Sequence, residues 1–283
     1  MKQFILGGEP DKNGAVRLSG DDYHYLVRVR RLASGEFFPA LLPDGRETLV
    51  QITSISNNVL TGKCREMKPN IEANKQLDAS QQIERQRKCL PPIILFQALP
   101  KSDKMDLIVR QAAEGGIAEI VPFVSDFSVV NNNTAKAAFS GGKKILRWER
   151  IIKEARQQSG SKTATALRPP VTLNELLKYW QELIITGDQA DSALGLLFHH
   201  LVLEQKSLHE YLNIIPNIVV LAVGPEGGFS DREVSLFLEN GFKPLTIGDT
   251  ILRTETAALY CSAAIRILLL ERNAWELKKE ARQ

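Results

Sequence analysis

The chain has 283 residues, which is long for one small domain and sufficient for two. Hydrophobic residues make up 43% and charged residues 24%, an ordinary globular composition that excludes a fibrous or wholly disordered chain. There are 36 basic and 33 acidic residues, and the resulting net charge of +3 does not by itself indicate a nucleic-acid partner.

The first part of the chain, residues 1–68, predicts a small β-barrel that carries one helix. Turn-forming residues divide it into short pieces, and three of these have the composition of strands: 37–42, 48–55 and 59–63. A helix is predicted before these strands, because Ser19 and Asp22 have the spacing of a capping box. Its apolar residues then repeat at helical spacing: Tyr25, Leu26, Val29 and Leu32. Residues 69–90 are polar and without a period, so we expect a linker there.

From residue 91 onward, apolar runs alternate with helical patterns. Strands are predicted at 93–99, 117–124, 194–198, 218–223 and 245–247. Helices are predicted at 102–114, 143–158 and 256–272, and behind three capping-box patterns, Thr172 with Glu175, Ser207 with Glu210, and Ser230 with Glu233. Strands that are apolar throughout are buried on both faces, and helices between them favour parallel pairing. The sequence therefore predicts an α/β domain with a mostly parallel sheet over residues 91–283.

The strongest local motif is the run Gly224-Pro225-Glu226-Gly227-Gly228. It stands where a predicted buried strand ends and a helix begins, which is the usual ligand position in open α/β sheets. Glycines allow the backbone to approach a ligand closely. The run is neither a GxGxxG nor a GxxxxGK[ST] motif, so a dinucleotide site fits poorly and a P-loop is excluded. The alternative interpretation is a tight turn with no ligand.

A second segment with candidate chemistry is residues 247–258, which lead from a strand into an apolar helix. Arg253 and Glu255 stand at the start of this helix, where Thr254 or Thr256 can act as its cap. One interpretation is a capped helix with an arginine–glutamate surface pair. However, an arginine is electrostatically unfavourable at a helix N-terminus, which indicates that its guanidinium group is directed elsewhere.

Positive charge is concentrated in two places. Arg28, Arg30 and Arg31 lie on or beside the first helix, and residues 143–156 carry six basic side chains against Glu149 and Glu154. Such runs are ordinarily solvated helix faces, but two of them can also line a surface that follows nucleic-acid phosphates. Trp148 repeats with the apolar residues of its helix, which predicts a core position for this side chain.

Metal and membrane sites are not expected. The three cysteines form no CxxC pair, and the neighbouring His199 and His200 have no third ligand at metal spacing. The apolar runs at residues 4–6 and 261–270 are too short for a signal peptide or a membrane span. Isolated cysteines are typical of a reducing compartment, so we expect a cytoplasmic protein.

Taken in order, five segments resemble the SPOUT-class RNA methyltransferases, in particular the bacterial family that methylates N3 of a uridine in 16S ribosomal RNA. The segments are LSGDDYHYLVRVRRL, LPKSDKMDLIVRQAAEGGIAEIVPF, RWERIIKEARQQSG, LAVGPEGGFSDRE and IGDTILRTETAAL. The resemblance implies a PUA-like RNA-binding β-barrel (1–68), a linker (69–90) and a SPOUT-type, mostly parallel sheet (91–283). It also implies a C-terminal trefoil knot, an exception to normal chain topology.

The resemblance further implies a homodimer that binds S-adenosylmethionine and acts on 16S rRNA of the small ribosomal subunit. By position, the cofactor-binding residues are Leu197, Phe198, His199, Gly224, Pro225, Glu226, Gly227, Ile247, Gly248, Ile251, Leu252 and Thr256. The RNA-binding residues are expected to be Lys2, Arg28, Arg30, Arg31, Arg147 and Arg150. The chain departs from the family in having Gln3, Ser161 and Thr250 where many relatives have arginine.

For this reaction Arg253 and Glu255 are the predicted catalytic residues. Uridine N3 is a weak nucleophile until its proton leaves, and a cation near O2 or O4 favours the deprotonated ring. We expect Arg253 to supply that cation, and Glu255 either to orient Arg253 or to take the proton through water. Two alternatives remain at this point: a SPOUT enzyme with another RNA target, such as a ribose 2′-hydroxyl or another base, and a non-catalytic ribosome-binding protein.

Overall fold

The computed structural model describes residues 3–66, 90–128, 142–185, 193–200, 204–246 and 248–280, with the backbone alone for 272–280. Contacts divide the chain into two compact units. The first comprises Met1–Gln76 and Lys153–Ala164, and the second Leu77–Ile152 and Thr165–Gln283. Residues 153–164 therefore belong with the first unit, although a long stretch of chain separates them from residues 1–76. The predicted linker, except Leu90, lies outside the described residues.

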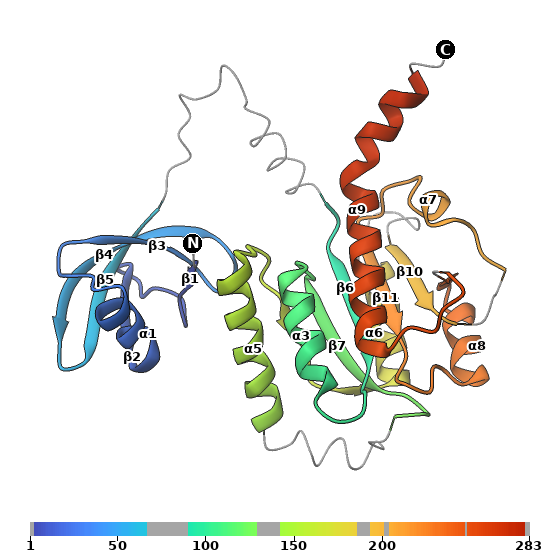
Figure 1. The fold of residues 1–283 in the computed structure, drawn as a ribbon, viewed down its shortest axis with the longest axis horizontal. Coiled ribbons are helices and arrows are strands. Elements are labelled where there is room, and N and C mark those ends of the chain that lie inside the picture. The colour runs from blue at the N-terminus through green and yellow to red at the C-terminus, as the bar shows by residue number, and fades with distance from the viewer. Residues whose placement is uncertain are drawn as a thin grey trace. The chain divides into compact units, whose positions relative to one another are not determined.

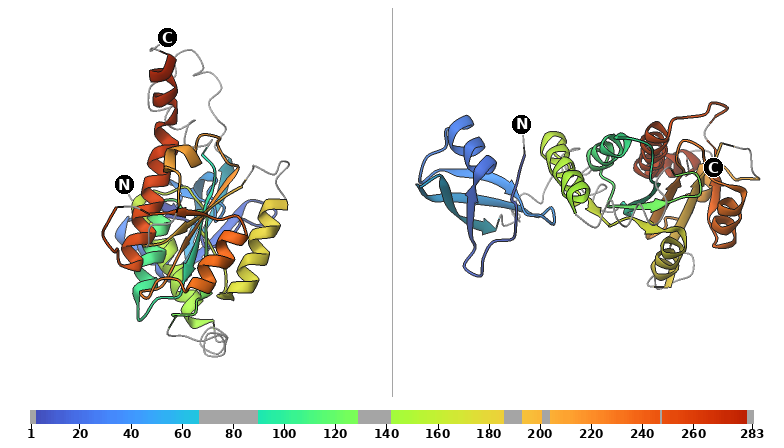
Figure 2. Two further views of the ribbon diagram at one scale, coloured as in Figure 1. Left: turned by 90° about the vertical axis from the view of Figure 1, so that its right-hand side faces the viewer. Right: turned by 90° about the horizontal axis from the view of Figure 1, so that it is seen from below.

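The first unit contains a curled five-stranded sheet (Figure 2). Its strand order is β1-β3-β4-β5-β2, with β1 parallel to β3 and the other neighbours antiparallel. The bounds are β1 (Phe4–Ile5), β2 (Ala15–Ser19), β3 (Phe37–Leu41), β4 (Glu47–Ser56) and β5 (Val59–Glu66). The three strands predicted here are confirmed. β1 and β2 add to them, and the inward side chains of the whole sheet enclose one apolar core that includes Phe4, Leu18, Phe38 and Leu60.

The helix of the first unit differs from the prediction. It is a single turn, α1 (Gly20–Tyr23), that continues into a π-helix, η1 (His24–Val29). The capping box was wrong: Ser19 belongs to β2 and makes no capping hydrogen bond, because the chain enters the helix through Gly20 at φ +59°. The wider π-turn changes which side chains face inward, so that Leu26 is buried while Val29 is 60% exposed.

The second unit contains a seven-stranded sheet in the order β12-β10-β11-β6-β7-β8, with β9 also paired to β7. Every pairing is parallel, which confirms the predicted sheet (Figure 1). The bounds are β6 (Ile93–Ala98), β7 (Glu119–Val124), β8 (Ala166–Leu167), β9 (Val171–Thr172), β10 (Ala193–Phe198), β11 (Ile218–Val223) and β12 (Lys243–Leu245). The strand predicted at 245–247 lies two residues earlier, because Pro244 and Leu245 are the buried residues that pair with β10.

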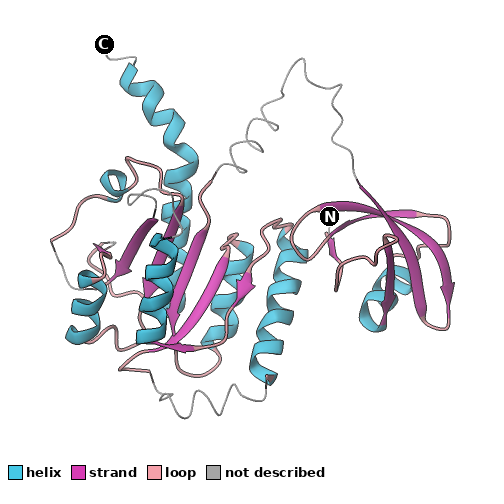
Figure 3. Ribbon diagram, turned by 180° about the vertical axis from the view of Figure 1, so that it is seen from behind, coloured by secondary structure: helices cyan, strands magenta, loops and turns pink. Residues whose placement is uncertain are grey.

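Helices cover both faces of this sheet (Figure 3). The helices described after residue 90 are α3 (Lys104–Glu114), α5 (Lys143–Ser159), α6 (Leu173–Ile185), α7 (Leu208–Tyr211), α8 (Asp231–Glu239) and α9 (Thr254–Glu280), and the part of α5 from Lys153 onward belongs with the first unit. On one face, α6 and α8 pack around Trp180, Phe237 and the strand residues Phe96 and Phe123. On the other, α9 contacts α3 as well as β6 and β11. The capping boxes predicted at Ser207 and Ser230 are confirmed, and Thr172 and Glu175 exchange the same hydrogen bonds before α6.

The predicted trefoil knot stays a prediction, because residues 201–203 and 247, on the loops that would form it, lie outside the described residues. None of the helices in the described ranges is long and apolar enough to cross a membrane.

Candidate functional site

A pocket of about 190 Å³ lies at one edge of the parallel sheet, where β10, β11 and β12 end. These strands run in one direction, so their carboxyl ends bring three separate stretches of chain together. The wall of the pocket is made by Phe198, His199, His200, Val223, Gly224, Pro225, Glu226, Gly227, Gly228, Thr246, Gly248, Thr250, Ile251, Leu252, Thr254 and Ala257.

Most of the cofactor-binding residues expected from the sequence meet in this pocket, although their role in binding stays a prediction. Of the expected set, Leu197 is buried within β10 and Thr256 is exposed, and neither lines the wall. Ile247 lies outside the described residues. Sequence reasoning missed His200, Thr246 and other wall residues. A local pattern could have indicated two of the missed residues. Thr254 and Ala257 are three positions apart at the start of α9, so they lie on the same face of the helix.

At Gly224 the glycine-rich loop is packed too closely for a side chain. A Cβ atom on Gly224 would lie 3.1 Å from the backbone carbon of Gly228, which is a neighbour that cannot rotate away. Gly228 itself has φ +72°, and its N–H donates to the carbonyl of Pro225 at 3.0 Å. The loop is therefore a tight turn whose backbone N–H and C=O groups border the pocket directly.

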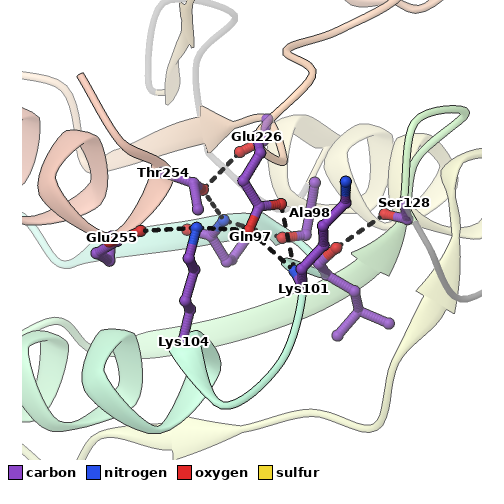
Figure 4. A network of polar contacts seen from close by, with 10 residues as sticks. Gln97, Ala98, Lys101, Lys104, Ser128, Glu226, Thr254 and Glu255 are labelled. Carbon is purple, nitrogen blue, oxygen red and sulfur yellow. Dashed lines mark hydrogen bonds and ion pairs between the residues drawn. The ribbon is translucent and has the colours of Figure 1, made fainter. Parts of the chain in front are cut away.

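A buried hydroxyl joins this loop to the start of α9. Thr254 Oγ1 donates to the carbonyl of Gly224 at 2.7 Å and accepts from Gln97 Nε2 at 3.0 Å (Figure 4). Thr254 was one of two candidate caps for α9, but the structure uses its hydroxyl as a connection between β6, the glycine-rich loop and the helix. This role depends on residues that are far apart in sequence.

Two carboxylates share one lysine beside the pocket. Lys104 Nζ lies 2.7 Å from Glu226 Oε1 and 3.8 Å from Glu255 Oε2. The backbone N–H of Lys101 also donates to Glu226, at 3.1 Å and 3.2 Å to its two oxygens. Burial raises the pKa of Glu226, but the hydrogen bonds and charge of Lys104, with the backbone donors, hold it below its ordinary value.

The structure does not join the two predicted catalytic residues. Arg253 is exposed, and within the described part of the chain no ion pair or hydrogen bond connects it to Glu255. Glu255 instead faces Lys104, with Oε2 buried and without a hydrogen-bond partner among the described residues. Lys104 was missed by sequence reasoning. Its one signal is its place just after β6, whose carboxyl end lies at the same edge of the sheet.

His199 presents an unsatisfied nitrogen at the pocket. Its side chain is buried, and Nδ1 has no hydrogen-bond partner among the described residues. Burial, followed by the charge of His200, lowers the pKa of His199 below its ordinary value, so the ring is neutral at pH 7. The residues that the structure describes contain no group of three or more histidine, cysteine or acidic side chains that could hold a metal ion.

Comparison with known proteins decides the family. Residues 87–266 match the family model described as an RNA methyltransferase domain, and residues 18–63 match the model of an RNA methyltransferase PUA domain. The chain belongs to this RNA methyltransferase family.

Several curated proteins are similar to this methyltransferase over nearly its whole length. Ribosomal RNA small subunit methyltransferase E 2 of Borreliella burgdorferi is 30% identical over 278 residues, which cover 96% of this chain and 100% of that protein. The Synechocystis ribosomal RNA small subunit methyltransferase E is 28% identical over 94% of this chain and 78% of its own length.

Solved structures show the same fold. A putative methyltransferase from Legionella pneumophila, in complex with the bound cofactor SAM, superposes with a TM-score of 0.69 at 26% identity, covering 94% of this chain and 97% of its own. A Neisseria gonorrhoeae ribosomal RNA small subunit methyltransferase E has a TM-score of 0.70 at 22% identity, with 95% and 98% coverage. The predicted fold class, a PUA-like domain followed by a mostly parallel α/β sheet, is confirmed.

The predicted RNA-binding arginines of the methyltransferase lie in both units. Arg28 and Arg31 are exposed and Arg30 is half-buried in the first unit. In the second, Arg147 and Arg150 are exposed on α5, where Arg147 pairs with Asp106. Lys2 lies outside the described residues. Contact of these residues with RNA stays a prediction.

Trp148 was predicted to be a core residue of α5 rather than a base-stacking platform. The side chain is buried, and its Nε1 donates to Asp106 Oδ1 at 3.0 Å. The prediction is confirmed.

Proposed function

We propose that the protein transfers a methyl group from S-adenosylmethionine to N3 of a uridine in 16S ribosomal RNA. The observation that carries this proposal is the pocket at the carboxyl edge of the sheet in a chain of the RNA methyltransferase family. Its relatives are named as methyltransferases of the small ribosomal subunit, and one similar structure is described with SAM bound.

The residues of the pocket fit this cofactor. Gly224, Gly227 and Gly228 line the pocket without side chains, and His199 Nδ1 has no hydrogen-bond partner among the described residues. The Gly224–Gly228 loop, the end of β10 and residues 248–252 would hold S-adenosylmethionine. When bound, the cofactor supplies an electrophilic methyl group on its sulfonium.

The chain's own residues then align and activate the nucleophile. We assign Arg253, which is exposed beside the pocket segment 248–252, to stabilise negative charge on the uracil ring as the N3 proton leaves. Glu255 is assigned as the proton acceptor, directly or through water. Among the described residues no hydrogen bond or ion pair connects Glu255 to Arg253, so we prefer this role to the orientation of Arg253.

RNA docking and dimer formation complete the proposal. The barrel of residues 1–68, with Arg28, Arg30 and Arg31, would bind RNA, and residues 91–283 would carry the reaction. A homodimer is supported by the exposed apolar side chains of α9, Leu259, Tyr260 and Ile267.

Methyl transfer to both naked 16S RNA and isolated small subunits from a strain that lacks the enzyme tests this function. We expect one methylated uridine, located by mass spectrometry of RNA fragments, and micromolar binding of S-adenosylmethionine by calorimetry. A methyl group on a ribose or another base would replace the proposed target. Failure to bind the cofactor would favour a non-catalytic ribosome-binding protein.

The role of Arg253 has its own test. Arg253→Ala is expected to bind S-adenosylmethionine as the wild type does and to lose at least about a hundredfold in turnover. Arg110→Ala, an exposed arginine on α3, is the matched control. Near-normal turnover of the Arg253 variant would refute the assignment.

A further inference from the structure

The pocket depends on a short segment that does not line it. Residues 97–104, which run from the end of β6 to the start of α3, contact both the glycine-rich loop and the start of α9, two segments that line the pocket. Gln97 donates a hydrogen bond to Thr254, and the N–H of Lys101 donates one to Glu226. The Lys104 side chain forms ion pairs with Glu226 and Glu255. Figure 4 shows these contacts converging from elements that are far apart along the chain.

The geometry points to Lys104 as a positioning residue that clamps the cofactor pocket closed through Glu226 and Glu255. Its Nζ is the charged group common to the glycine-rich loop, at Glu226, and to the start of α9, at Glu255. This inference rests on the proposed function, because it names what holds the pocket in the shape that S-adenosylmethionine requires.

Charge explains why a lysine is needed. The side chains of Lys104, Glu226 and Glu255 are 32%, 24% and 13% exposed, so this cluster is only partly screened by water. With Lys104 in place, two carboxylates on separate loops are attracted to one cation. Without it, the same carboxylates repel each other, and the partly buried Glu255 loses the cation that lies 3.8 Å from its Oε2.

The backbone contacts cannot replace this clamp. The N–H of Lys101 still holds Glu226 when the Lys104 side chain is removed, and Thr254 still donates to Gly224. Neither contact reaches the carboxylate of Glu255. The expected defect is therefore a pocket whose two sides separate more readily, which weakens cofactor binding more than it slows the chemical step.

The test compares Lys104→Met with Lys104→Arg in the full-length protein. Binding of S-adenosylmethionine is measured by calorimetry, and kcat and the KM for the cofactor are measured at saturating RNA. Loss of a charge-assisted hydrogen bond predicts cofactor binding weaker by about tenfold to a hundredfold for Lys104→Met, with kcat at saturating cofactor within about threefold. Lys104→Arg keeps the charge and is expected to stay within about fivefold of the wild type.

Two further variants complete the design. Lys178→Met removes one exposed lysine of α6 and controls for the change of net charge. The double variant Lys104→Met/Glu226→Gln is expected to lose less free energy of cofactor binding than the sum of the two single variants, because both changes break the same contact. If Lys104→Met does not fold, Lys104→Gln replaces it as the uncharged variant that is compared with Lys104→Arg.

The inference is overturned if Lys104→Met binds the cofactor within twofold of the wild type. It is also overturned if Lys104→Arg is as weak as Lys104→Met, since packing rather than charge would then explain the effect. Failure of the wild-type protein itself to bind S-adenosylmethionine is a different result and refutes the proposed function.

Discussion

Replacing Thr254 by valine tests the buried connection between β6, the glycine-rich loop and α9. Valine has nearly the shape of threonine but no hydroxyl, and Thr254 is only 3% exposed. The change removes the donor to the Gly224 carbonyl and the acceptor for Gln97 Nε2, while Nε2 keeps its bond to the carbonyl of Ala98 at 2.9 Å. A buried polar group left without its partner costs about 1 to 3 kcal/mol.

The Gly224 carbonyl and Gln97 Nε2 each lose a hydrogen-bond partner, and only Gln97 Nε2 keeps a second one. We therefore expect Thr254→Val to lower the free energy of unfolding by about 2 to 4 kcal/mol. In a unit of this size that corresponds to a fall in Tm of about 5 to 15 °C. Urea unfolding followed by tryptophan fluorescence measures it directly, because Trp148, Trp180 and Trp275 all belong to the second unit.

Thr254→Ser is the control, since it keeps the hydroxyl and loses a single methyl group, at a cost of about 1 kcal/mol. A valine variant destabilised by less than about 1 kcal/mol, or a serine variant destabilised as much as the valine one, would refute this reasoning.

Three further outcomes are expected. Gly224→Ala places a Cβ 3.1 Å from the backbone of Gly228, so the loop must shift, and calorimetry should show cofactor binding at least about tenfold weaker. Burial raises the pKa of Glu226, but the ion pair and hydrogen bonds of this carboxylate lower that pKa more. The stabilisation from ionised Glu226 is therefore present at neutral pH and is lost as the pH falls below the ordinary pKa of a glutamate. The stability difference between the wild type and Glu226→Gln, from urea unfolding, should therefore shrink between pH 6 and pH 3. Ile267→Glu places a charge on the exposed apolar side of α9, and light scattering should find single chains instead of dimers.

Matched controls separate these effects from general damage. Gly8→Ala adds a Cβ where no atom lies within 4 Å, and Ile185→Glu places the same charge on an exposed residue of α6. The first should bind the cofactor normally and the second should stay dimeric. A Glu226→Gln difference that persists at pH 3, or a Gly224→Ala variant with wild-type affinity, would contradict the corresponding prediction.

Local patterns were sufficient for much of the fold. The apolar runs at 93–99, 117–124 and 218–223 became adjacent parallel strands, because a segment with no polar face must be covered on both sides. Ser207 and Ser230 became helix caps as predicted, since their hydrogen-bond partners lie three residues away.

Local patterns did not predict the very short strands or the irregular helix. β1, β8 and β9 have two residues each, too few for any alternation to be visible. The π-helix at 24–29 does not follow the 3.6-residue period of an α-helix. Val29 is therefore exposed, although its spacing from Leu26 predicted one shared apolar face.

The sequence by itself determined the parallel sheet, the position of the glycine-rich loop at its carboxyl edge and the resemblance to an RNA methyltransferase family, because each depends on residues close together in the chain. Only the tertiary structure decided what surrounds that loop. Lys104 and Glu226 are separated by 122 positions, and Gln97 and Thr254 by 157. Nothing in the local sequence of either partner specifies such a pair, because it forms only when the whole sheet has brought the strand ends to one edge.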